Sequence, residues 1–131
     1  MKKKIKLLAL VLLATVSVAM AQTTKPKWAE MKTFHSYMSS TFHPAEDGDF
    51  GPLKKFKDSL LDAAELWQAS PIPSDFKPVE TKAALEKLVT ECRAIKKAVK
   101  AGMADAELFK MITRAHDTFH TITGECRKAD D

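Results

Sequence analysis

The stretch LEKLVTECRAIKKAV, residues 85–99, decides the fold. Its apolar side chains recur at intervals of three and four residues, which places them on one side of an α-helix. The same spacing is typical of the seam along which the helices of a bundle pack. We therefore predict an amphipathic helix over 79–100, with Gly102 as a left-handed cap at its C-terminal end. The seam positions are Leu85, Leu88, Cys92, Ile95 and Val99.

Three further segments carry the helical period, and clusters of proline and glycine separate them. They cover residues 27–41, 52–70 and 105–126, and Asp105 is the expected N-cap of the last one. No stretch shows the sustained alternation of a half-buried strand. Four amphipathic helices with short connections predict an all-α fold, an up-down-up-down antiparallel four-helix bundle over residues 22–131.

The first 21 residues form a different kind of segment. A lysine-rich start, an apolar run and the ending Ala19-Met20-Ala21 predict a secretory signal peptide over 1–21, cleaved before Gln22. The apolar run is short for a membrane span, which needs roughly 20 residues. We expect a periplasmic or secreted protein with no stable membrane insertion after cleavage; an uncleaved anchor is the alternative.

The charge balance and the motifs exclude several function classes. The chain has 21 Lys and Arg against 17 Asp and Glu, but four of the lysines lie in the signal segment. The remaining chain is formally neutral and has no concentrated basic stripe, so no nucleic-acid partner is expected. A Ser-His-Asp elbow, a glycine-rich phosphate loop and a Glu-x-x-His motif are all missing from the sequence. We therefore predict a protein that is not an enzyme.

The four histidines fall in two short clusters near opposite ends of the mature chain. His35 and His43 lie in FHSYMSSTFH (34–43), and His116 and His120 lie in HDTFH (116–120). Two histidines four residues apart on a helix point to one face and can chelate one metal ion. The sequence therefore predicts a transition-metal site built from these four imidazoles, with zinc or copper as the preferred ion.

The expected helix pairing brings the two clusters to a similar depth. If the first and last helices are antiparallel and level, Met31 lies opposite His120 and His35 lies opposite His116. His43 precedes a proline, which disfavours helical geometry at the residue before it. We expect the chain to turn there, so that His43 can fold back over the site.

The two cysteines are not expected to form a disulfide. Cys92 should lie near Ile112, and Cys126 should lie about 20 Å further along the last helix. A disulfide needs Cα atoms within about 7 Å. We expect Cys92 to be a buried apolar thiol and Cys126 to be a surface thiol or a contact in a homodimer.

The layout resembles the periplasmic four-helix cytochromes, cytochrome c-prime and the soluble b-type cytochrome of the same fold. The shared features are the signal peptide, four helices, a proline-rich second connection, SPIPSDFKP (70–78), and TRAHDTFH (113–120) near the end of the last helix. Covalent haem is excluded because Ile112 and Ala115 stand where a CxxCH motif has its cysteines. EMKTF (30–34) and FH (119–120) look like the ligand positions of the b-type relative. The resemblance implies non-covalent haem b between Met31 and His120.

Three functions follow from these features. The first is a bundle that binds a transition metal through His35, His43, His116 and His120. The alternative is a b-type haem protein in electron transfer. The third is a periplasmic adaptor or sensor without a cofactor, whose histidines respond at most to pH.

Overall fold

The structure is a computed structural model that describes residues 28–129. The predicted signal peptide, 1–21, lies outside the described residues, and the domain boundary at residue 22 stays a prediction. Within 28–129 the chain is helical and has no strand beyond one isolated bridge between Phe76 and Arg127. The elements are α1 (Ala29–Glu46), α2 (Gly51–Ala69), α3 (Pro78–Lys100), α4 (Asp105–His120) and the π-helical turn η1 (Thr121–Glu125).

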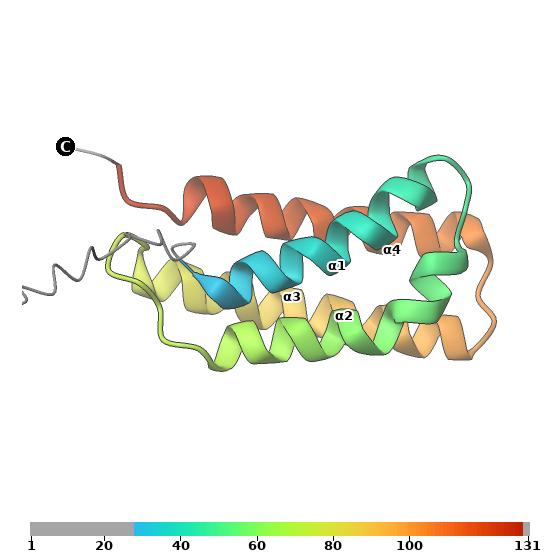
Figure 1. Cartoon of the computed structure of the whole chain (residues 1–131), viewed down its shortest axis with the longest axis horizontal. Helices are drawn as coiled ribbons and strands as arrows, with labels where there is room; N and C mark the ends of the chain where they lie inside the picture. Colours follow the sequence, from blue (N-terminus) through green and yellow to red (C-terminus); the bar gives the residue numbers. More distant parts are fainter. Residues whose placement is uncertain (1–27, 130–131) are drawn as a thin grey trace, which may run out of the picture.

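The four helices lie side by side along one long axis (Figure 1). Consecutive helices run in opposite directions in this view, which is compatible with an antiparallel bundle. Each consecutive pair of helices is in contact, and α1 also contacts α4. The α1–α4 contact is the least extensive of these four, so the seam between the first and last helix is the most open one.

The core confirms the predicted seam of α3. Leu85, Leu88, Cys92 and Ile95 are buried, and Val99 is half-buried at the edge. Near the start of α1 and the end of α2, aromatic rings form one cluster with centroid separations of 4.9–5.9 Å. Its members are Trp28, Phe34, Trp67, Phe76 and Phe119.

The end of α1 differs from the prediction. The helix continues through His43 and Pro44 to Glu46, so the expected turn at His43 is wrong. Pro44 lies in the last turn, where it removes one backbone donor, and buried Phe42 and Ala45 hold that turn against the core. The chain leaves the helix at Gly48, whose φ of +83° favours glycine.

In the α3–α4 connection, the predicted cap at the end of α3 is confirmed and the predicted N-cap of α4 is wrong. Gly102 adopts the predicted left-handed conformation, with φ +70°, and the Met103 N–H donates to the Ala98 carbonyl at 3.0 Å. Ala104, not Asp105, occupies the N-cap of α4. Asp105 begins the helix instead, where its negative charge favours the helix dipole, and it pairs with Lys54 at 3.0 Å.

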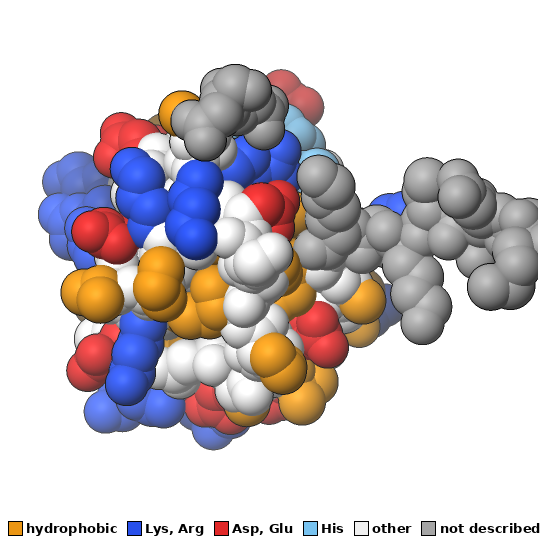
Figure 2. Space-filling model, turned by 90° about the vertical axis from the view of Figure 1, so that its left-hand side faces the viewer, with side chains coloured by type: hydrophobic (Ala, Val, Ile, Leu, Met, Phe, Trp, Pro, Cys, Tyr) orange, Lys and Arg blue, Asp and Glu red, His pale blue; other side chains and the backbone are white. Residues whose placement is uncertain are grey.

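The surface carries charges of both signs. At the end of the bundle that carries the α2–α3 connection, acidic and basic side chains surround a band of apolar ones (Figure 2). Among residues 28–129, no helix combines the length and the apolar character that crossing a membrane requires.

Candidate histidine site

The centre of the site is the predicted pair on α4. One helical turn separates His116 from His120, and their Nε2 atoms are 3.1 Å apart. His120 is exposed and His116 is half-buried. The two ring nitrogens therefore share a hydrogen bond at the protein surface, and a metal ion bound to both would replace it.

His116 is fixed from the α1 side by an aromatic contact. Its ring stacks on Phe42, with centroids 3.9 Å apart and planes 15° from parallel. Burial lowers the pKa of His116, because the charged imidazolium loses solvation there, and the neighbouring His120 lowers the pKa further. Asp117 acts in the opposite direction. The balance favours the neutral imidazole, the form that binds metal.

His43 lies at the same end of the seam but is held by its own helix. Its Nδ1 is 2.9 Å from Glu46 Oε1, and both side chains are exposed. The charges of His43 and Glu46 both act on His116, so these two side chains lie close to the α4 pair. The last turn of α1 thus holds an imidazole and a carboxylate beside the candidate site.

His35 takes a different place from the expected one. Its ring stacks on Phe119, with centroids 5.2 Å apart and planes 10° from parallel. Phe119 is three residues beyond His116, so α1 and α4 are shifted by almost one turn from the level pairing. His35 consequently lies nearer to the level of His120 than to that of His116.

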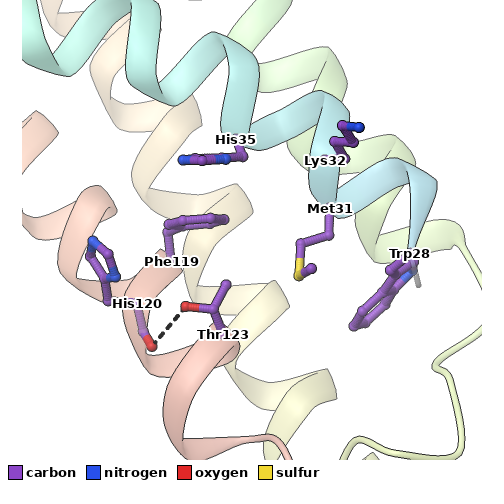
Figure 3. Close-up of a pocket in the computed structure, with 7 residues that line it drawn as sticks. All are labelled: Trp28, Met31, Lys32, His35, Phe119, His120 and Thr123. Carbon is purple, nitrogen blue, oxygen red and sulfur yellow. Dashed lines mark hydrogen bonds between the residues drawn. The ribbon is translucent and has the colours of Figure 1, made fainter. Parts of the chain in front are cut away.

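A pocket of about 510 Å³ opens between α1 and α4 beside His120. Figure 3 shows Met31 and His120, the residues that the haem hypothesis names, both lining it, with the Phe119 ring between them. Lys32 and Thr123 also line the pocket but are not among the site residues predicted from the sequence, although Thr123 follows His120 by three residues and shares its face. The lining residues are Trp28, Met31, Lys32, His35, Phe119, His120 and Thr123.

The four histidines do not form one ready-made ligand set. Across residues 28–129, no group of three or more His, Cys, Asp or Glu side chains is arranged to hold a metal ion. The structure brings His116 and His120 together, while His43 is engaged with Glu46 and His35 with Phe119. The four-histidine metal site therefore stays a prediction.

The cysteines take no part in this site. Both are free, and Cys92 is buried as expected. The expectation of a surface thiol at Cys126 is wrong, because this side chain is 3% exposed. Its backbone carbonyl accepts from the Lys77 N–H at 2.7 Å, which ties the segment after η1 to the start of α3.

Comparisons with protein-family models, with curated proteins and with solved structures each found no match.

Proposed function

We propose that this protein is a non-enzymatic, exported four-helix bundle that binds a transition-metal ion at His116 and His120. The observation that supports it is the 3.1 Å separation of the two Nε2 atoms. With both nitrogens about 2.0–2.1 Å from a metal ion, the N–metal–N angle would be about 100°. That angle suits a tetrahedral zinc ion and also a tetragonal copper ion.

The electrostatics of the pair support the same function. A metal ion binds neutral imidazole, and the pKa of His116 is lowered by burial and by His120. His35 and His43 lie on α1 on either side of the pair and are the nearest imidazoles of the same chain. The four-histidine set of the sequence hypothesis would require either ring to leave its present partner, which is Glu46 for His43 and Phe119 for His35.

The finer description of the fold belongs to this proposal. We infer the up-down-up-down order of the cytochrome c-prime and b-type bundles, supported by the contacts of α1 with both α2 and α4. Export to the periplasm or beyond rests on the signal-like residues 1–21.

A titration with zinc and with copper tests the metal site. We expect His116→Ala and His120→Ala each to weaken binding by at least about 100-fold, since loss of an outer partner alone costs about 10–100-fold. The Cys92→Ala control should bind as the wild type does, because that thiol is buried elsewhere. Stoichiometric metal retained by the double histidine variant would contradict the proposal.

Non-covalent haem b is the second candidate, because Met31 and His120 line the same pocket. Its volume of about 510 Å³ and its aromatic walls, Trp28 and Phe119, suit a flat apolar ligand.

Haem addition separates the two candidates. A Soret band that Met31→Ala abolishes and His116→Ala preserves would favour the cytochrome. Zinc or copper binding that His116→Ala abolishes and Met31→Ala preserves would favour the metal site. A protein that takes up neither metal nor haem would leave the adaptor or sensor hypothesis.

A further inference from the structure

A stripe of uncharged side chains runs along α4 and into η1. Its residues are spaced by four, three, four and three, so they share one face, with the spacing of a two-helix seam. None is fully buried: Phe109 is 37% exposed, His120 is exposed, and the others are half-buried. The stripe consists of Phe109, Thr113, His116, His120 and Thr123.

The metal site on this stripe is incomplete within one chain. A structural zinc site takes four protein ligands in a tetrahedron. One chain presents two converging nitrogens, and residues 28–129 contain no third ligand arranged with them. The other two imidazoles of the chain would have to leave their partners to join the pair, His43 from Glu46 at 2.9 Å and His35 from Phe119. The two α4 rings already lie together and would only exchange their mutual hydrogen bond for the ion.

We infer that one zinc ion joins two copies of this chain, with His116 and His120 of each copy as its four ligands. This inference rests on the proposed metal function and names the partner of that site. A two-fold axis through the ion makes the interface self-complementary, as in most homodimers.

The stripe suits such an interface chemically. If the two α4 helices cross antiparallel about the midpoint of the pair, His116 of one copy faces His120 of the other, and Thr113 faces Thr123. These positions carry no formal charge while the histidines are neutral, so no like charges meet along the stripe. Exposed Phe109 adds apolar surface at one end, where it stacks parallel to Phe42 at 6.5 Å.

Sedimentation velocity of the purified exported chain, with zinc analysis of each species, tests the inference. We expect monomer in EDTA and dimer at half an equivalent of zinc per chain. His116→Ala and His120→Ala should stay monomeric. His35→Ala and His43→Ala should dimerise as the wild type does, because neither residue is a ligand in the joined site.

The outcomes separate this inference from the function on which it rests. One zinc per chain in a monomer, lost in His35→Ala or His43→Ala, would overturn the dimer and leave the metal function standing. The absence of both zinc and copper binding would overturn the dimer and the metal function together.

A charge on the stripe tests where the second copy sits. Phe109→Glu should weaken zinc-dependent dimerisation at least tenfold, because it replaces apolar contact surface with a charge that loses water at each end of the interface. Leu66→Glu is the matched control, since Leu66 is also an exposed apolar side chain, 65% accessible, but lies on α2. Equal dimerisation of the two variants would overturn the placement on α4.

Discussion

His116 is the histidine whose surroundings constrain it most. The charged groups that act on its pKa are His120 and Asp117 on α4 and His43 and Glu46 on α1. Asp117 and Glu46 raise the pKa of His116, because a carboxylate favours the charged imidazolium. Burial and the other two imidazoles lower it. Burial has the largest effect, so the pKa of His116 lies below its ordinary value of 6.5.

The first prediction is a loss of stability in mild acid. The pKa of His116 is lower in the folded protein than in the unfolded chain. At pH values between these two pKa values, the unfolded chain therefore binds more protons than the folded protein. The contribution of His116 to the free energy of unfolding is complete above about pH 6.5 and declines as pH falls through the folded pKa. Urea denaturation of the metal-free protein between pH 5 and 8 measures this.

The control for this prediction removes the titrating ring. His116→Gln should flatten the pH dependence in that window, whereas Thr123→Ala, which changes a side chain that does not titrate there, should leave it unchanged. An NMR titration that placed the pKa of His116 above 6.5 would contradict the assigned cause.

The thiols give a second prediction at the residue scale. Burial raises the pKa of Cys92 to about 12, and burial also raises the pKa of Cys126. The thiolate is the reactive form, so neither cysteine should react with a disulfide reagent at pH 8 in the folded protein. Denaturant should expose two thiols per chain. Rapid labelling of one thiol without denaturant would show that the end of the chain opens.

At the scale of the elements, the cap at Gly102 links α3 to α4. A Cβ added at Gly102 would meet nothing within 4 Å, so the only obstacle to a side chain is the positive φ of +70°. We predict that Gly102→Ala lowers the free energy of unfolding by about 1–2 kcal/mol. Chemical denaturation measures this loss.

Gly124 provides the matched control for that substitution. It also has nothing within 4 Å of an added Cβ, but its φ lies outside the positive region. Gly124→Ala should therefore be neutral or slightly stabilising. Equal losses in the two alanine variants would mean that backbone conformation is not the cause.

The elements also show what the sequence could predict. Hydrophobic spacing located all four helices, because each helix buries one face, as α3 does with Leu88 and Ile95. The helix end at Pro44 was missed, because the rule for the residue before proline is local, and the burial of Phe42 and Ala45 outweighs it.

The candidate site was predicted only in part for a similar reason. The His116–His120 contact follows from spacing within one helix. The position of His35 depends on how far α1 is shifted along α4, and that shift is set by packing of side chains such as Phe34 against Phe119. A single sequence does not contain this offset, so it does not determine which of the α1 imidazoles lies beside the α4 pair.

For the whole molecule, the aromatic cluster joins parts that are distant in the sequence. Trp67 is fully buried and packs against Trp28, Phe34 and Phe119, which come from the N-cap of α1, from α1 itself and from α4. Trp28 Nε1 also donates to Ser70 Oγ at 2.7 Å, which holds the start of α1 to the end of α2. Stability should therefore depend strongly on this cluster.

Neighbouring residues of α2 allow a direct test of that dependence. Trp67 is 0% exposed and Leu66 is 65% exposed, although they adjoin in one helix. We predict that Trp67→Ala costs about 3–5 kcal/mol, because it removes a large ring and leaves a cavity among three others. Leu66→Ala should change stability by less than about 0.5 kcal/mol. Urea denaturation with an unchanged m-value measures both, and similar losses would mean that α2 does not present Trp67 to the core.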